Sequence, residues 1–451
     1  MVGPSGYGHL GLLQSLVGLA GIVVELGLGT AVVQEGARLV GIQDKTGATR
    51  VWSTAASTMI LSGGGAVVVL VSFRSQIAGW VLDNDDLGSH VTWSAVTLAL
   101  SLAGNFRTSV LTAHRAVTDL AKTTIITTFV GSAGALALAG QFGTAGLAPG
   151  MAFTAATRWA VAWFLTAKHC DVRWLHLFSR GWAGHAKSLL SVGLPVTGSI
   201  LVGPGVQTAL PLLLLQFVGK SGVGLYQAAS SIVLVFFGFL AATVGQDYYP
   251  RLRALADDGQ ATAMLVSQQH RLMILLTGTI ALCAKAGLPF VVPILLAKDF
   301  VGLTTILDWH LPGEIVRFSS VTFSYLVLSR GGGVLFFLTS MVNGLVLLGG
   351  ILFLVPWLGV QGAGVAFLLA YSTYWVLMVG VCWQRFKVRP KNSELRLLSL
   401  TLVCACMPNL ISRSPAKPIL ETVFALGFVL FALRALTKEF GWTFAKLRPT
   451  R

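Results

Sequence analysis

Residues 188–228 read SLLSVGLPVTGSILVGPGVQTALPLLLLQFVGKSGVGLYQA, which is a long apolar run, a glycine-rich turn and the start of a second apolar run. The turn at 219–224 (GKSGVG) resembles residues 3–8 (GPSGYG), with glycine and serine recurring at an offset of 216 residues. A second pair of turns, 143–146 and 359–362, has the same offset. Because these matches occur in order and at turns, they predict two homologous halves.

A third match supports the repeat and has a consequence for the N-terminus. At an offset of 215 residues, Ser109 and Arg115 correspond to Ser324 and Arg330. The apolar run 188–217 precedes the second half, whereas no such run precedes the first half in the sequence. The repeat therefore predicts one further helix of about 20 to 30 residues upstream, lost through a mis-assigned start codon. The alternative is a first half that is one helix short.

The composition is that of an integral membrane protein. Apolar residues make up 54% of the chain and charged residues 11%, with a mean hydropathy of +0.76. Soluble domains carry about 25% charged residues. The net charge of +15 would suggest nucleic acid as a partner for a soluble protein. Here most Lys and Arg residues fall in alternate loops, so they indicate topology and contact with anionic membrane lipids, and not nucleic acid.

The hydropathy pattern predicts an all-α, polytopic membrane protein with about 13 transmembrane helices, or 14 with the upstream helix. With Met1 outside, the basic loops alternate consistently and the C-terminus is cytoplasmic. The predicted spans are 9–33, 53–73, 92–112, 123–140, 146–167, 188–217, 223–246, 271–296, 314–329, 333–356, 361–384, 397–412 and 418–437.

These spans group into two homologous halves, with two more spans after the second half. The loop 168–187 joins the lobes on the inside and its Trp, Leu and Phe residues among basic ones predict an interfacial helix. The predicted parts are an N-terminal lobe (1–167), the linker (168–187), a C-terminal lobe (188–384), two C-terminal helices (397–437) and a basic cytoplasmic tail (438–451).

No motif predicts catalysis, a cofactor or a metal. The sequence Gly219-Lys220-Ser221 resembles the end of a phosphate-binding loop, but Leu214 stands where that loop needs its first glycine. The His and Cys residues match no metal-site spacing. The outer loops carry no Ser/His/Asp or paired-carboxylate arrangement, so the chain is not expected to be an enzyme.

Charged side chains within the spans are the candidate site residues, because a charge at membrane depth faces a wet cavity or a partner. Glu25 and Arg158 lie deep in their spans and predict a cavity role, although a structural ion pair between the two is equally compatible. Arg107 with Asn105, Arg317 and Lys285 complete the predicted substrate-binding set. For Arg107, Arg317 and Lys285, snorkelling towards the membrane surface is a competing interpretation.

Several stretches resemble the polysaccharide transporters of the multidrug/oligosaccharidyl-lipid/polysaccharide flippase superfamily, most closely the Wzx-type O-antigen translocases. The resemblance extends over residues 3–385. It is carried by GPSGYGHLGLLQSLVGLAGIVVELGLGTAVVQEGARL (3–39), VGKSGVGLYQAASSI (218–232), YYPRLRALADD (248–258), DFVGLTTILDWHLPGEIVRFSSVTFSYLVLSRGG (299–332) and GVQGAGVAFLLAYSTYWVLM (359–378).

The resemblance implies a fold of two pseudo-symmetric helical lobes around a central cavity, followed by two C-terminal helices. It also implies a flippase of the bacterial inner membrane. Its substrate would be an undecaprenyl-diphosphate-linked oligosaccharide, moved from the inner to the outer leaflet by alternating access. Cationic groups such as Arg158 and Arg107 would bind the diphosphate, and Glu25 would bind a coupling ion (H⁺ or Na⁺) or form a releasable salt bridge. The implied protein partners are a polysaccharide polymerase and a chain-length regulator. The alternatives are a cation-coupled multidrug exporter, a lipid II flippase, a degenerate paralogue that does not transport, and, in a different class, an O-antigen polymerase or ligase.

Overall fold

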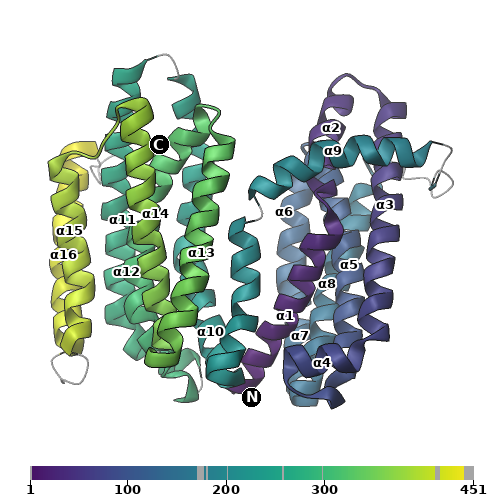
Figure 1. Ribbon diagram of the computed structural model, residues 1–451, viewed down its shortest axis with the longest axis horizontal. Helices are drawn as coiled ribbons and strands as arrows, with labels where there is room; N and C mark the ends of the chain where they lie inside the picture. Colours follow the sequence, from purple (N-terminus) through teal and green to yellow (C-terminus); the bar gives the residue numbers. More distant parts are fainter. Residues whose placement is uncertain are drawn as a thin grey trace, which may run out of the picture. The chain divides into compact units, whose positions relative to one another are not determined.

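The chain folds into two compact helical units, residues 1–215 and 216–451. The computed structural model describes residues 3–169, 177–178, 181–200, 202–255, 258–296, 298–411 and 417–440, and every regular element in these ranges is helical (Figure 1). The predicted all-α fold is therefore confirmed. The predicted linker and tail lie partly outside the described residues, at 170–176, 179–180 and 441–451.

The first unit contains nine helices among its described residues and the start of a tenth. They are α1 (Pro4–Glu25), α2 (Leu28–Gly41), α3 (Lys45–Ser72), α4 (Arg74–Leu82), α5 (Gly88–Ala113), α6 (Val117–Ile126), α7 (Ser132–Phe142), α8 (Leu147–Thr166), α9 (Trp182–Ile200) and the first part of α10 (Val202–Ala254). A π-helical turn at Thr127–Gly131 joins α6 to α7.

The second unit contains the rest of α10 and six further helices among its described residues. These are α11 (Gly259–Leu295), α12 (Leu303–Ser329), α13 (Gly333–Leu358), α14 (Gln361–Phe386), α15 (Asn392–Cys406) and α16 (Lys417–Phe440). Helices α12, α13 and α14 pack together, and α15 and α16 pack against α11. The last two helices correspond to the predicted spans 397–412 and 418–437.

The predicted span 9–33 is wrong as a single helix. Helix α1 ends at Glu25, and α2 begins at Leu28. Between them Leu26 (φ 49°) and Gly27 (φ 75°) both adopt the left-handed conformation, which a right-handed helix does not accommodate. The sequence around this break, VVELGLGT, is mostly apolar and contains no cluster of polar turn residues. The break lies directly beside Glu25.

The predicted span 188–217 covers the end of α9, to Ile200, and the start of α10, from Val202, and residue 201 between them lies outside the described residues. Helix α9 packs against α2 and α3 and runs across them (Figure 1). Its exposed His185 and Lys187 and its buried Ala186 and Leu189 explain this placement, since one face is apolar and the other polar.

Much of the predicted interfacial helix 168–187 lies outside the described residues, at 170–176 and 179–180. Residues 177–178 form a turn, and α9 begins at Trp182. The indole of Trp182 donates a hydrogen bond to the carbonyl oxygen of Thr54 at 3.3 Å, and the backbone N–H of Phe178 donates to the Ser57 hydroxyl at 3.0 Å. These contacts hold this segment against α3.

The backbone of the predicted repeat is reproduced at its turns. Gly143 (φ 60°, ψ −133°) ends α7, and Gly359 (φ 59°, ψ −147°) ends α13. Only glycine adopts these angles readily. A Cβ on Gly146 would overlap the carbonyl of Leu138, and a Cβ on Gly362 would overlap that of Leu354, at the same offset of 216. Within α10, Gly219 (φ 63°) interrupts the helix at the predicted turn.

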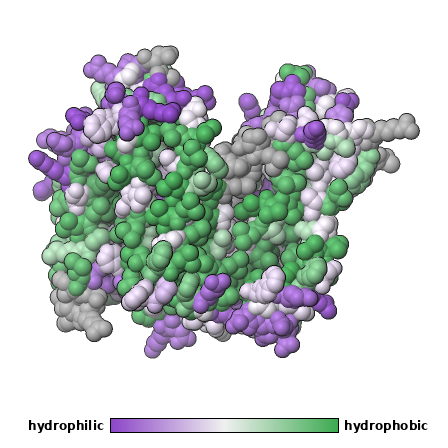
Figure 2. All heavy atoms as spheres, viewed as in Figure 1, coloured by the Kyte–Doolittle hydropathy of each residue, from purple (hydrophilic) through white to green (hydrophobic). Residues whose placement is uncertain are grey.

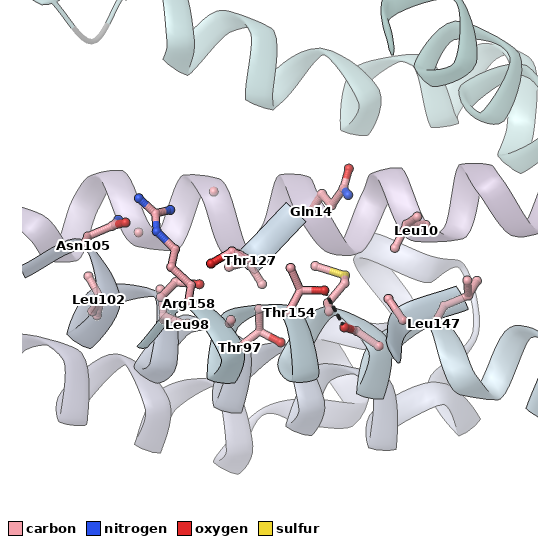
Figure 3. A pocket seen from close by; sticks show the side chains of 18 of the residues that line it. Leu10, Gln14, Thr97, Leu98, Leu102, Asn105, Thr127, Leu147, Thr154 and Arg158 are labelled. Atoms are coloured by element: carbon pink, nitrogen blue, oxygen red, sulfur yellow. Dashed lines mark hydrogen bonds between the residues drawn. The ribbon is translucent and has the colours of Figure 1, made fainter. Parts of the chain in front are cut away.

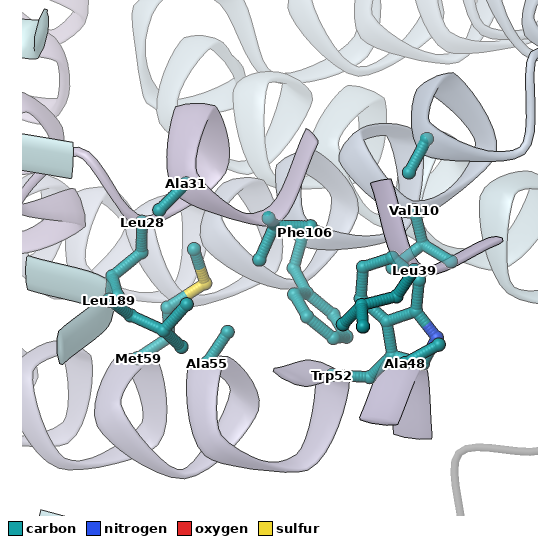
Figure 4. Close-up of a cluster of buried hydrophobic side chains, with 12 residues drawn as sticks. Leu28, Ala31, Leu39, Ala48, Trp52, Ala55, Met59, Phe106, Val110 and Leu189 are labelled. Atoms are coloured by element: carbon teal, nitrogen blue, oxygen red, sulfur yellow. The ribbon is translucent and has the colours of Figure 1, made fainter. Parts of the chain in front are cut away.

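A hydrophobic core fixes one end of the first unit, where α2, α3 and α5 meet. It gathers side chains from α2, α3, α5 and α9 around Trp52, which is 2% exposed (Figure 4). Helix α5 contributes Phe106 and Val110 to it. Because α5 is held there on one side, its other faces are fixed against α1 and α8, where the site lies.

The surface is that of a membrane protein. On each unit, hydrophobic side chains form a band, and hydrophilic ones gather towards the ends of the helices (Figure 2). Eight of the described helical segments are long and apolar enough to cross a membrane, by length and composition alone. Helices α5 and α12, which carry buried polar residues, have similar lengths of 26 and 27 residues.

Candidate functional site

The candidate site is a cavity of about 650 Å³ within the first unit. Its walls come from α1, α5, the π-helical turn and helices α7 and α8. Most of the lining is apolar, and the polar side chains are Gln14, Glu25, Thr97, Ser101, Asn105, Thr127, Thr154 and Arg158 (Figure 3). Three predicted site residues, Glu25, Asn105 and Arg158, therefore line one cavity.

Arg158 supplies the positive charge of this cavity. It lies in the middle of α8, and its side chain is exposed although its helix packs closely on α5. Among the described residues, none forms a hydrogen bond or an ion pair with the Arg158 guanidinium. A structural ion pair therefore does not hold it in place. Figure 3 shows Arg158 and Asn105 at one end of the row of lining residues, with Leu10 and Leu147 at the other. Such a guanidinium offers forked donors to an anion.

Glu25 places a negative charge near Arg158. The carboxyl is half-buried, at the last residue of α1, and is close enough to Arg158 for the two charges to attract each other. The absence of a side chain at Gly29 makes room for it, because a Cβ there would overlap Glu25 Oε1 and approach Ser109 Oγ at 3.3 Å. The left-handed break at Leu26–Gly27 is what brings the start of α2 to this carboxyl.

The remaining polar groups are neutral hydrogen-bonding side chains. Asn105 on α5 lies beside Arg158 (Figure 3). Thr154 donates to the carbonyls of Gly150 (3.0 Å) and Gly131 (3.2 Å), which ties α8 to the π-helical turn. Thr127, at the start of that turn, has a buried hydroxyl oxygen with no hydrogen-bond partner in the described part of the chain. No pattern in the sequence predicts this π-helical turn.

Arg107 lies elsewhere, although it is only two residues from Asn105. Positions i and i+2 point to different sides of a helix. Arg107 is 6% exposed, and its guanidinium lies over the Trp163 ring at 4.0 Å, a cation–π contact. It lines a separate cleft between α3, α5 and α8, and not the cavity.

Arg317 belongs to the second unit and is paired. Its Nη1 donates to Glu314 Oε1 at 2.9 Å, and the Glu314 side chain is 1% exposed. His310 lies on the same helix, with its Nε2 3.6 Å from Glu314 Oε1 and its ring stacked on Phe367. Sequence reasoning missed Glu314. The signal was its spacing of three residues from Arg317, which places both on one face of α12.

Lys285 also has protein partners. Its Nζ donates to the carbonyl oxygen of Ala405 at 2.7 Å and to Asn409 Oδ1 at 2.5 Å, and lies 3.9 Å from Glu421 Oε1. Asp308 completes the group by accepting from Lys417 at 2.5 Å. These contacts join α11 and α12 to the C-terminal helices, so Lys285 lies within a structural network.

A sequence model of the family described as polysaccharide biosynthesis protein matches residues 1–304. The chain belongs to this family. Among curated proteins it is similar to the lipid III flippases of Escherichia coli (strain K12) and Shigella flexneri, each 26% identical over 167 residues. That match covers 36% of this chain and 39% of the relative, so the chain aligns with about two fifths of the length of these relatives.

Solved structures share the fold. The inward closed conformation of the lipid II flippase MurJ matches with a TM-score of 0.71 and 13% identity, over 96% of this chain and 97% of that one. An inward-facing multidrug resistance MATE transporter of the MOP superfamily matches with a TM-score of 0.68 and 18% identity, over 85% and 91%. The predicted resemblance to a polysaccharide family is confirmed by the family match, and the fold is that of MurJ and MATE transporters.

Proposed function

We propose that this protein is a flippase that moves an undecaprenyl-diphosphate-linked oligosaccharide, such as an O-antigen repeat unit, across the bacterial inner membrane by alternating access. The observation that carries the proposal is the cavity with Arg158, Asn105 and Glu25 on its walls. A cavity within membrane-spanning helices that holds an exposed cation suits an anionic headgroup. Family membership and the similarity to lipid III flippases support a lipid-linked saccharide as the cargo.

Each polar side chain has a role in this proposal. Arg158 binds a diphosphate oxygen by charge-assisted hydrogen bonds, which offset the loss of water around the headgroup. Asn105, at the same end of the cavity, donates its amide to the headgroup. Glu25 attracts the Arg158 guanidinium when the cavity is empty and is released when phosphate takes its place, or it binds the coupling ion (H⁺ or Na⁺).

The orientation follows from the charge distribution. With the basic loops inside, the C-terminus is cytoplasmic, and the headgroup enters from the inner leaflet and leaves to the outer one. The polymerase and the chain-length regulator would then act on the product outside. A lipid III-type saccharide is an equally well supported cargo, because the similarity to the lipid III flippases extends over residues of this chain and not only over its fold.

The exporter alternative has one observation in its favour. The sequence suggested few acidic residues within spans, but Glu314 adds a buried carboxylate to Glu25 and Glu421. Glu314 is already paired with Arg317 and faces His310, so it is not available as a simple cation site in this conformation. The flippase proposal therefore stands ahead of a cation-coupled exporter.

The test is lipid analysis of a deletion strain that carries the wild-type gene, Arg158→Ala or Arg50→Ala. Arg50 is an exposed arginine in a predicted inner loop and serves as the matched control. We expect lipid-linked oligosaccharide to accumulate inside the deletion strain, and the wild type and Arg50→Ala to relieve this. Arg158→Ala should lower transport about 30-fold, equivalent to about 2 kcal/mol from a charged hydrogen bond.

Protein level in the membrane is measured alongside by immunoblotting. Normal transport by Arg158→Ala would contradict the role of the cavity. If single repeat units reached the surface of the deletion strain without being polymerised, this would instead favour the polymerase hypothesis. Unchanged lipid-linked oligosaccharide together with increased drug sensitivity would favour the exporter.

A further inference from the structure

A second hollow lies on the other side of α5 from the cavity. It is a cleft of about 380 Å³ between α3, α5 and α8. Its lining is almost wholly apolar, and Arg107 is the one charged side chain among the described residues that form it. Trp159 and Trp163 form one wall from α8, and Gly64 forms part of the α3 wall.

The cleft opens where, among the described residues, none packs against α3. Ile60 is 47% exposed, and a Cβ on Gly64 would meet no atom within 4 Å. In a predicted membrane span, this open apolar space is in contact with lipid. The lining runs along α3 from Ala56 to Val67, about 16 Å at 1.5 Å per residue. One leaflet of the hydrocarbon core, half of about 30 Å, has this length.

The charged side chain of the cleft, Arg107, lies at one end of it. Arg107 lies towards the C-terminal end of α5, and Ala56 lies towards the N-terminal end of α3. Both ends lead into loops that the basic residues assign to the cytoplasm. Trp163 holds the Arg107 guanidinium in position through their 4.0 Å contact. A cation at the inner end of an apolar cleft one leaflet long matches a lipid with an anionic headgroup.

We infer that the cleft binds one acyl chain of an anionic phospholipid from the cytoplasmic leaflet, with the headgroup phosphate attracted to Arg107. A chain of one leaflet's length fits the cleft, whereas a polyprenyl carrier is longer. Leu102 lines both the cleft and the cavity, so the bound chain supports the α5 wall of the cavity. This site does not depend on the proposed function, because the membrane itself supplies the ligand.

Two neighbouring glycines provide a matched test. Gly64 lines the cleft, and Gly65 does not. Both are exposed on α3, and a Cβ on either meets no atom within 4 Å, so Gly64→Leu and Gly65→Leu should fold equally well. Only Gly64→Leu fills the cleft. The full-length protein is titrated with dioleoyl phosphatidylglycerol in detergent, and bound lipids are counted by native mass spectrometry.

We expect the wild type to retain one phosphatidylglycerol more tightly than the rest. Gly64→Leu should weaken this binding about tenfold, and Gly65→Leu less than about twofold. Arg107→Gln should reduce the preference for phosphatidylglycerol over phosphatidylcholine with the same chains. Equal binding by the two leucine variants would overturn the proposal. Displacement of phosphatidylglycerol by an equal concentration of undecaprenyl diphosphate would overturn it too, in favour of the carrier lipid.

Discussion

The two units use the same backbone repeat and fill it differently. In the first, Arg158, Asn105 and Glu25 border an open cavity. At the offset of 216, Arg158 corresponds to Tyr374, which is 6% exposed, and Glu25 corresponds to Ala241 in the uninterrupted part of α10. At these two positions the second unit thus has uncharged side chains where the first has charged ones.

The two units also differ in which charged side chains they carry and in how these are paired. At the offset of 215 that relates Ser109 to Ser324, the ion pair of buried Glu314 and partly exposed Arg317 corresponds to Ala99 and Leu102. In the second unit, the charged residues are neutralised by neighbours, and aromatic rings such as Phe367 and Tyr371 pack beside them. The difference teaches that a charged residue within a span is a candidate site residue only where no neighbouring side chain forms an ion pair with it. The repeat alone does not predict which half contains such a residue.

The largest effect is expected from breaking the pair of the second unit. Glu314→Leu leaves Arg317 without its carboxylate and should lower the free energy of unfolding by about 3 kcal/mol. Glu314→Leu with Arg317→Leu restores an apolar pair like that of the first unit and should recover most of the loss. Chemical unfolding in detergent measures both. If the double variant were no more stable than the single one, the pairing would not be what stabilises this interior.

A second test separates the Lys285 network from the cavity. Lys285→Met removes the ammonium shared by Ala405, Asn409 and Glu421 and should cost about 2 kcal/mol. Residues 417–440 should then become accessible to protease while transport per folded molecule is retained. Lys298→Met, at an exposed lysine, is the control. Loss of transport in a stable Lys285→Met protein would instead revive the predicted substrate role.

The smallest effects on stability are expected at the repeated glycine turns, and they should be equal in the two units. Gly143→Ala and Gly359→Ala each force a side chain into the same positive-φ conformation and should each cost about 1 to 2 kcal/mol. Gly140→Ala, within α7, has no neighbour within 4 Å and should be neutral or stabilising. Thermal unfolding compares the three. Unequal costs at Gly143 and Gly359 would show that the repeat is less faithful than its angles suggest.

The sequence was sufficient for the fold and for part of the site. Hydropathy predicts the helices, and glycine spacing predicts the turns at Gly143, Gly219 and Gly359, because both depend on local composition. Depth within a span predicted that Arg158 and Glu25 face a cavity, and both line one, while their role stays a prediction. It failed for Lys285, because the partners of its ammonium come from residues more than a hundred positions away in the chain.

Two other features of the first unit could not be predicted from the sequence. The break at Leu26–Gly27 lies in an apolar run, and a leucine with positive φ has no characteristic sequence pattern. Asn105 and Arg107 are close in sequence, but the helix separates them into two different hollows. Only the packing of α5 between α3, α1 and α8 decides which side chain reaches which hollow.

The break between α1 and α2 also bears on how a carboxylate is tolerated at this depth. It exposes the first turn of α2, whose unpaired N–H groups carry about half a positive charge. Glu25 lies directly before this turn, with its carboxyl beside Gly29. The helix dipole therefore stabilises the Glu25 anion whether or not Arg158 faces it. An anionic substrate that takes Arg158 consequently leaves Glu25 with this part of its compensation, about 0.3 to 1 kcal/mol.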